Sequence, residues 1–120
     1  MVVDDDLAVL KMTEDMLARL GYEPVGFLAS TRALEALHAD PDRFDVVLTD
    51  ESMPDLTGTE LAVAIKELRP DLPVIVASGY GGADLHRRAL AAGAQAVVNK
   101  PYDSSALAQA LAYALDRVAS

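Results

Sequence analysis

The sequence predicts an α/β domain in which helices cover both faces of a five-stranded parallel sheet. Short runs rich in β-branched residues alternate five times with longer Ala- and Leu-rich amphipathic segments. Right-handed crossovers between successive strands then require a parallel sheet with helices on both sides. The length of 120 residues suits a single domain over 1–120, and a composition of 52% hydrophobic and 24% charged residues suits a packed core.

The first two strand–helix units come before residue 42. Val2-Val3 begins the first strand, and a helix is expected over about 7–20, followed by a glycine that can end it. Four leucines share one face of this helix: Leu7, Leu10, Leu17 and Leu20. Residues 23–27 have the composition of a second strand. Ser30 could cap the second helix, which stops before Asp40-Pro41. Two leucines give this helix its apolar face: Leu34 and Leu37.

The other three units follow in the same order. Residues 44–49 (FDVVLT) form a strand that is apolar on both faces, as a parallel sheet requires. A helix from about Thr59 directs three residues inward: Leu61, Ile65 and Leu68. Residues 73–77 form the fourth strand, and a glycine-rich loop leads from it into a helix that ends near Gly93. The last two elements are a strand and a helix: residues 96–99 and about 104–117.

Composition and charge exclude several functions. The chain has no Cys, which excludes disulfides and thiolate metal sites and favours a reducing cytoplasm. No run approaches the roughly 18 apolar residues of a membrane span, and no signal-peptide pattern opens the chain. Ten Lys and Arg against nineteen Asp and Glu give a net charge of −9, so direct contact with nucleic acid or membrane is not expected. The short segment before the first acidic cluster suggests a domain cut from a longer protein.

Residues with reactive or charged side chains follow the predicted strands at their carboxyl ends, where sheets of this kind bind ligands. These residues are Asp4-Asp5-Asp6, Asp50, Ser78 and Lys100. Each has a structural alternative: Asp6 can complement a helix dipole, a lone Asp can form a turn, and a Lys before Pro can be merely solvated. These alternatives do not explain why all the groups fall on one edge of the sheet.

Crowded carboxylates repel one another, and a hard divalent cation is the usual remedy. Mg²⁺ takes about six oxygen ligands and retains several waters, so two carboxylates and one carbonyl suffice. A softer metal finds no ligands, because Cys is absent and the two histidines fall inside helices, on whose surfaces we place them. These histidines are His38 and His86. The sequence therefore predicts a magnesium site.

The charges also suit phosphoryl chemistry. Asp4, Asp5 and Asp50 carry three negative charges, which Mg²⁺ and Lys100 together would neutralise. A phosphoryl group on Asp50, an established type of covalent nucleophile, would then meet a metal, an ammonium and a hydroxyl. The glycine-rich loop over 79–82 lacks the spacing of a P-loop, so it does not predict nucleotide binding.

At this point the chain resembles a receiver domain, the phosphoacceptor module of two-component signalling. The resemblance covers essentially all 120 residues and depends on separated motifs in family order and spacing. These motifs are VVDDD at 2–6, DESMP at 50–54 with Gly58, Ser78-Gly79 and Lys100-Pro101. The resemblance implies a flavodoxin-like, doubly wound (βα)5 sandwich whose parallel strands run in the order 2-1-3-4-5.

The resemblance also implies where the phosphoryl group and the metal bind. Asp50 would accept the phosphoryl group from a phosphohistidine. Mg²⁺ would be held directly by Asp5, Asp50 and the main-chain carbonyl of Ser52, and by Asp4 through a water. The phosphohistidine would belong to a partner kinase or phosphotransfer protein.

Further roles follow from the same resemblance. Ser78 stands at the family's Thr/Ser switch and would donate to the phosphoryl oxygens, while Lys100 would pair with them from the other side. Gly79 leaves room for the phosphoryl group to enter. The Lys100–Pro101 peptide bond is commonly cis in this family.

The chain departs from the family pattern at one position. Many members carry an aromatic residue three positions before the strand-five Lys, where this chain has Val97. An aliphatic side chain cannot make the same inward swing. Tyr80 could gate the site or merely pack on its loop, and Ser52 and Tyr80 both occupy positions that tune hydrolysis in the family.

Phosphorylation is expected to act on the face built from the fourth helix, the fifth strand and the fifth helix, and so on an output partner or an attached domain. Dimerisation through this domain is a further expectation. Candidate output residues are Leu85, Arg88, Leu111 and Tyr113, although apolar residues on such helices are more often core.

Three functional classes stay open. A signalling receiver would promote only its own phosphorylation and dephosphorylation. A Mg²⁺-dependent phosphohydrolase of the haloacid-dehalogenase type would need a second Asp where Ser52 stands, together with a cap segment. A pseudo-receiver that only binds partners would lack at least one of Asp5, Asp50 and Lys100, and all three are present.

The parent protein has several possible architectures. The style of the motifs over 50–61 and 72–80, together with the short first strand, favours a hybrid sensor histidine kinase, which as a whole would be a protein-histidine kinase. A free-standing receiver is the first alternative. A transcription factor is the second, and its DNA contact would then lie outside this chain.

Overall fold

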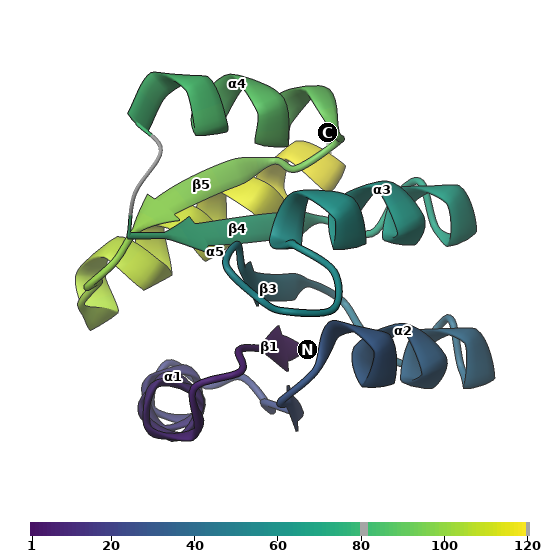
Figure 1. Cartoon of the computed structure of the whole chain (residues 1–120). Helices are drawn as coiled ribbons and strands as arrows, with labels where there is room; N and C mark the ends of the chain where they lie inside the picture. The colour runs from purple at the N-terminus through teal and green to yellow at the C-terminus, as the bar shows by residue number, and fades with distance from the viewer. Residues whose placement is uncertain (80–81, 120) are drawn as a thin grey trace.

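A computed structural model describes residues 1–79 and 82–119 and shows a three-layer α/β sandwich (Figure 1). The described strands form one parallel sheet in the order β2-β1-β3-β4-β5. Its strands are β1 (Val2–Val3), β2 (Gly26–Phe27), β3 (Val47–Asp50), β4 (Val74–Ser78) and β5 (Ala96–Asn99). The helices are α1 (Leu7–Arg19), α2 (Ser30–Ala39), α3 (Gly58–Leu68), α4 (Gly82–Ala91) and α5 (Ser104–Ala119). The predicted fold class and strand order are confirmed.

The central strands are apolar on both faces because each face has its own helical layer. Alternate residues of a strand point to opposite faces, so Val47 packs on one side of the sheet and Leu48 on the other. Figure 1 shows α2, α3 and α4 on the first side and α1 and α5 on the second. Residues from the first layer include Leu37, Leu61, Ile65 and Ala89, and those from the second include Leu10, Leu17, Leu107 and Leu111.

Three strands begin later than the sequence predicts: β2, β3 and, by one residue, β4. β2 begins at Gly26, because its neighbour β1 pairs through only two residues and a strand extends only as far as its partner does. β3 begins at Val47, yet Phe44 is buried in the core just before it. At their carboxyl ends β3 and β4 extend one residue further than predicted, so Asp50 and Ser78 are themselves strand residues.

Two predictions about helices are wrong in detail. Ser30 does not cap α2: Ala29 is the N-cap residue and makes no side-chain cap, and Ser30 is the first helical residue. Leu7 is 55% exposed, whereas Leu10 and Leu17 are buried. At about 100° per residue, Leu10 and Leu17 lie within about 20° of each other around the axis of α1, and Leu7 lies about 60° further round.

Two of the candidate output residues belong to the core. Leu85 and Leu111 are 3% and 1% exposed, so the prediction that they form a partner surface is wrong. The amphipathic pattern of α4 and α5 directs these leucines toward the sheet. Arg88 and Tyr113 are exposed, and so are both histidines, as expected. In the described part of the chain, no helix has the length and apolar character needed to cross a membrane.

Candidate functional site

The site forms at the carboxyl ends of four neighbouring strands. Asp4 directly follows β1, Asp50 ends β3, Ser78 ends β4 and Lys100 follows β5. The register pairs Asp50 with Ala77, so the ends of β3 and β4 lie together. The Lys100 main-chain N–H donates to the Ser78 carbonyl at 2.8 Å. The parallel register therefore brings the predicted residues to one edge, as their positions in the sequence indicated.

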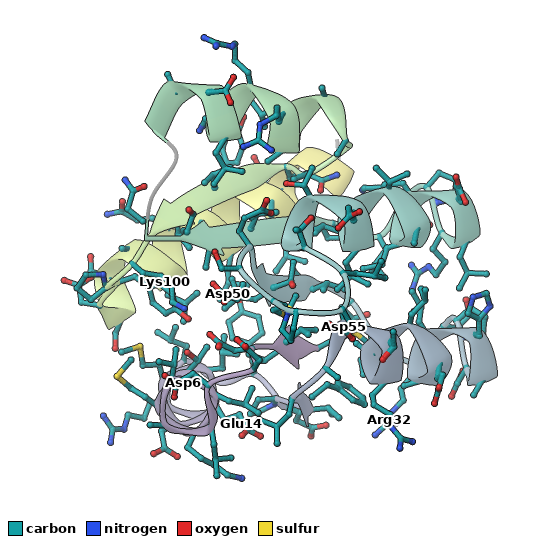
Figure 2. The ribbon with its side chains drawn as sticks, viewed as in Figure 1. Asp6, Glu14, Arg32, Asp50, Asp55 and Lys100 are labelled. Carbon is teal, nitrogen blue, oxygen red and sulfur yellow. The ribbon has the colours of Figure 1, made fainter. Side chains whose placement is uncertain are left out.

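Lys100 bridges two buried carboxylates. Its Nζ donates to Asp4 Oδ2 and to Asp50 Oδ1, each at 3.1 Å, and Figure 2 shows Lys100 beside Asp50 at the sheet edge. Asp4 and Asp50 are 4% and 7% exposed. Such charge-assisted hydrogen bonds are stronger than neutral ones, and burial protects them from screening by salt. The bridge holds residues distant in sequence in one rigid group.

Asp5 adds a third carboxylate and completes an acidic cluster that is suited to binding a cation. Asp4, Asp5 and Asp50 each offer an oxygen, and these oxygens lie within 4.8 Å of one another. Among the described residues, this is the only group of three or more possible metal ligands. Asp5 is exposed, so the cluster opens to solvent. Hard oxygen ligands, open to water on one side, suit Mg²⁺.

The cluster has an excess of negative charge, because three carboxylates face one ammonium. Burial raises the pKa of Asp50 above its usual range; the hydrogen bond from Lys100 opposes this shift, and the charge of Asp4 adds to it. One ammonium cannot balance three carboxylates. A divalent cation would supply the missing charge, which agrees with the predicted magnesium site.

Lys100 stays protonated in this environment. Burial alone would lower its pKa, but hydrogen bonds to Asp50 and Asp4, together with their charges, raise it above the usual value. Lys100 therefore acts as a fixed positive charge at neutral pH and not as a base.

Asp6 has a structural role beside the cluster. Its carboxylate caps α1 by accepting from the N–H groups of Ala8 and Val9 at 2.9 and 3.2 Å. The Asp6 N–H in turn donates to Asp4 Oδ1 at 2.9 Å. The helix-dipole alternative is thus confirmed for Asp6, and the same turn orients Asp4 toward the site.

The loop between β3 and α3 follows the candidate phosphoacceptor and is tied down at both ends. At its start, Glu51 N–H donates to the Ala77 carbonyl at 2.9 Å, and Glu51 Oε1 accepts from the N–H and the hydroxyl of Thr59 at 2.7 Å each. At its end, Thr57 and Glu60 form a capping box. Ser52 lies in this loop and is exposed.

The remaining predicted residues lie around this edge. Ser78 is 6% exposed, and Gly79 beside it is open, since a Cβ there would contact nothing within 4 Å. Val97 is half-buried against the core. The Lys100–Pro101 bond is cis. Tyr80 lies outside the described residues.

Sequence reasoning missed two side-chain links at this edge. Thr13 of α1 and Tyr102, just after Lys100-Pro101, join their hydroxyls at 2.7 Å. Asp55 binds Ser30 and Thr31 at the start of α2. Thr13 is a polar residue on the buried face of α1, and such a residue predicts a buried hydrogen-bond partner. No local pattern predicts the contact between Asp55 and α2.

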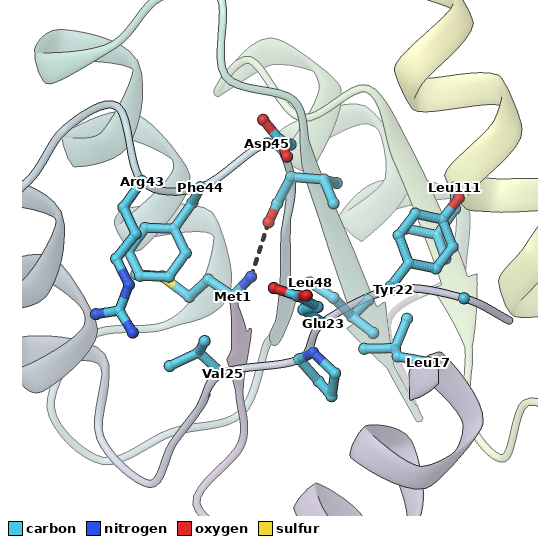
Figure 3. Close-up of a pocket in the computed structure, with 13 residues that line it drawn as sticks. Met1, Leu17, Tyr22, Glu23, Val25, Arg43, Phe44, Asp45, Leu48 and Leu111 are labelled. Atoms are coloured by element: carbon cyan, nitrogen blue, oxygen red, sulfur yellow. Dashed lines mark hydrogen bonds between the residues drawn. The ribbon is translucent and has the colours of Figure 1, made fainter. Parts of the chain in front are cut away.

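Among the hollows that the described residues form, one lies beside the site and another lies at the amino terminus. One of about 340 Å³ lies next to Lys100 and is lined by Val9, Met12, Gly79, Lys100, Pro101 and Tyr102. The other, of about 450 Å³, contains the Met1 ammonium, which donates to the Val46 carbonyl at 2.9 Å (Figure 3). Burial lowers the pKa of this ammonium to about 6, although Asp45 opposes the shift. None of the predicted site residues lines this second hollow.

The fold and the site define a class of protein: a doubly wound α/β domain with an acidic, lysine-bridged cluster at the carboxyl edge of its sheet. The sequence model of the response regulator receiver domain family matches residues 1–112. This chain belongs to that family.

Comparison with individual proteins agrees with this membership. The chain is 33% identical over 115 residues to the response regulator protein PilR of Pseudomonas aeruginosa, covering 96% of this chain and 25% of PilR. It is 35% identical over 116 residues to the DNA-binding transcriptional regulator NtrC of Azospirillum brasilense, covering 97% of this chain and 24% of NtrC. The chain thus spans about a quarter of the length of these curated relatives.

Solved structures show the same fold. A response regulator receiver domain from Clostridium thermocellum superposes with a TM-score of 0.91 at 31% identity, covering 97% of this chain and 92% of the other. The beryllofluoride-activated NtrC4 receiver domain dimer gives a TM-score of 0.89 at 28% identity, covering 98% and 95%.

Proposed function

We propose that this domain is a phosphoacceptor of a two-component phosphorelay, in which Asp50 takes a phosphoryl group from a phosphohistidine in a Mg²⁺-dependent reaction. The observation that carries the proposal is the buried Asp50 carboxylate, joined through Lys100 to Asp4 and lying beside Asp5. The donor would be a histidine kinase or a phosphotransfer protein. Such a domain works in the cytoplasm.

In the transfer, an Asp50 carboxylate oxygen forms a bond to phosphorus while the phosphorus–nitrogen bond of the donor breaks. The donor imidazole keeps the electron pair and takes up a proton. Lys100 stabilises the negative charge that reaches the phosphoryl oxygens, because its ammonium already contacts Asp50. Asp5, Asp50 and the Ser52 carbonyl would hold Mg²⁺, with Asp4 acting through a water. Bound Mg²⁺ supplies charge neutralisation for the phosphoryl group.

The switch would start at Ser78. Its hydroxyl would donate to the phosphoryl oxygens, and its carbonyl already accepts from the main chain of Lys100. Movement there would bias the face formed by α4, β5 and α5. Val97 in place of an aromatic residue argues against a ring swing as the coupling. Gly79 leaves space for the phosphoryl group, and Ser52 and Tyr80 would tune its lifetime.

The relatives also bear on the architecture of the full-length protein to which this domain belongs. The relatives PilR and NtrC are a response regulator and a DNA-binding transcriptional regulator, and this favours a response regulator with an attached effector domain. They do not support the hybrid histidine kinase that the motif style suggested. We therefore propose that DNA contact, where it occurs, lies outside residues 1–120.

The test is intact-mass measurement after incubation with acetyl phosphate and Mg²⁺, beside an Asp50→Asn control. The expected result is a gain of one phosphoryl group that requires Mg²⁺ and is absent from the variant. No gain from acetyl phosphate or from a phosphohistidine protein, with the chain folded, would favour a pseudo-receiver. Turnover of small phosphate esters would favour a phosphohydrolase, which the Ser52 position argues against.

A further inference from the structure

Asp55 ties the loop that follows Asp50 to a helix distant in sequence. Its Oδ1 accepts from the Ser30 hydroxyl at 2.6 Å, and its Oδ2 accepts from the N–H and the hydroxyl of Thr31 at 2.9 and 3.0 Å. Figure 2 shows Asp55 at the start of α2. One carboxylate thus takes three hydrogen bonds from the first turn of α2.

The helix side of this contact is built to receive Asp55. Ser30 is fully buried, and its hydroxyl also accepts from the Leu56 N–H at 3.0 Å. Because Ala29 makes no side-chain cap, the carboxylate of Asp55 caps α2 from another segment. The Ser30 and Thr31 hydrogen bonds hold the pKa of Asp55 far below its usual range, so Asp55 is ionised throughout the working pH range.

The contact of Asp55 with α2 anchors the middle of the loop between β3 and α3. Glu51 secures the start of this loop, the capping box of Thr57 secures its end, and Met53 is buried in the core between them. Asp55 fixes the loop on the side of α2. Ser52, whose carbonyl is expected to bind the cation, therefore lies in a segment held on both sides.

We infer that Asp55 is a positioning residue for the cation site: its hydrogen bonds to Ser30 and Thr31 hold in place the loop that carries the Ser52 carbonyl. This inference rests on the proposed function. It links the start of α2 mechanically to metal binding, although no α2 side chain belongs to the acidic cluster.

Two variants test the link from its two sides. Asp55→Asn puts an amide donor where the carboxylate accepts from Thr31, and Ser30→Ala removes the 2.6 Å donor while leaving the net charge unchanged. Glu35→Gln is the matched control, because Glu35 is an exposed α2 carboxylate whose ion pair with Arg32 is long, at 3.8 Å. It removes the same charge as Asp55→Asn and leaves the loop untouched.

The readouts are the Mg²⁺ dissociation constant of the whole chain by titration calorimetry and the Mg²⁺ dependence of phosphorylation by acetyl phosphate. Residues that orient metal ligands typically change metal affinity by about 10-fold or more, and for this longer link we expect a loss of roughly 3- to 10-fold in both variants. The half-saturating Mg²⁺ concentration should rise by the same factor while the rate at saturating Mg²⁺ stays near that of the parent chain. Circular dichroism melts verify that each variant is folded. If Asp55→Asn does not fold, the Mg²⁺ affinity of Ser30→Ala decides the test.

Several outcomes would overturn the inference. Unchanged Mg²⁺ affinity in both variants would do so, and so would an equal loss in Glu35→Gln, since that would reflect charge alone. A lower saturating rate with unchanged half-saturation would place Asp55 outside metal positioning. If the parent chain itself neither binds Mg²⁺ nor gains a phosphoryl group, the proposed function fails first, and the inference fails with it.

Discussion

Asp50 is buried beside Asp4. Among the described residues, Lys100 supplies the positive charge that compensates the Asp50 carboxylate. This environment opposes ionisation of Asp50, whose pKa is raised. Burial of Asp50 and repulsion between the carboxylates therefore destabilise the site in the metal-free chain. A bound divalent cation would relieve this repulsion, both before and after Asp50 carries a phosphoryl group. The same burial that makes Asp50 costly to ionise keeps water from competing with Lys100 for the phosphoryl oxygens.

This cost predicts a pH-dependent effect of Asp50→Asn on stability. A carboxyl whose folded pKa is raised binds more protons in the folded than in the unfolded chain, so its contribution to stability falls as pH rises from about 3.8 through the folded pKa. In metal-free buffer, the variant should therefore melt a few degrees above the parent chain at pH 7. The difference should shrink toward pH 4.

Thermal melts at both pH values, with and without Mg²⁺, check this prediction. Mg²⁺ should raise the melting temperature of the parent chain at pH 7 and leave that of Asp50→Asn nearly unchanged, since a ligand stabilises only the state that binds it. An Asp50→Asn variant that melts lower at pH 7 than the parent would contradict the charge argument.

The buried hydroxyl pair of Thr13 and Tyr102 gives a second prediction at the residue scale. Thr13→Val or Tyr102→Phe alone leaves one buried hydroxyl without its 2.7 Å partner and should cost about 1–3 kcal/mol of unfolding free energy. The double variant should cost clearly less than the sum of the two. Urea unfolding measures all three, with Tyr22→Phe as a phenol control away from the site. Strict additivity would show that the two hydroxyls are not coupled.

At the scale of elements, the turn from β3 into α3 depends on one glycine. A Cβ on Gly58 would lie 2.5 Å from the Asp50 carbonyl oxygen and 3.1 Å from the Glu51 Cα, both of them backbone atoms that cannot move aside. Gly58 N–H also donates to the Glu51 carbonyl at 3.0 Å. The helix thus starts directly against the strand end that carries Asp50.

Gly58→Ala should therefore cost about 3 kcal/mol or more, at the upper end of overpacking effects. Gly79→Ala is the matched control, because its added Cβ would contact nothing within 4 Å and its φ is not positive. The control should leave stability within about 1 kcal/mol of the parent chain. Chemical denaturation of both proteins compares them, and equal costs would mean that the close approach to Asp50 is not what constrains Gly58.

Element boundaries were predicted well where periodicity was strong and less well where pairing decided them. The inward faces of α3 and the span of β5 follow directly from the sequence pattern. The start of β2 depends on β1 as its pairing partner, and the first turn of α2 depends on Asp55, a residue 25 positions from Ser30. Such contacts have no local signature.

At the scale of the whole molecule, the candidate site lies at the carboxyl edge of the sheet, and the proposed output face is formed by α4, β5 and α5. Leu85 and Leu111 are core, so Arg88 and Tyr113 are the exposed candidates on α4 and α5. If the face formed by α4, β5 and α5 is the output face and mediates the dimerisation expected for this domain, beryllofluoride, a phosphoryl mimic, together with Mg²⁺ should favour self-association. Light scattering at several protein concentrations should show a rise in average mass toward a dimer.

Arg88→Glu and Tyr113→Ala should reduce that association by about tenfold without changing phosphorylation of Asp50, because neither residue belongs to the acidic cluster. The mass gain from acetyl phosphate is the control that the site is intact. A mass that stays monomeric with beryllofluoride would direct the output to a different partner.

The sequence by itself determined the fold class, the strand order and the edge of the sheet where the candidate site lies, because hydrophobic periodicity and strand-end positions are local features of the chain. It also indicated Asp5, Asp50 and Lys100 through motif spacing. Only the tertiary structure decided which leucines are core and that Asp55 and Tyr102 hold neighbouring elements in place. These facts depend on pairs of groups far apart in sequence, and burial and hydrogen bonding between such groups exist only once the sheet is assembled.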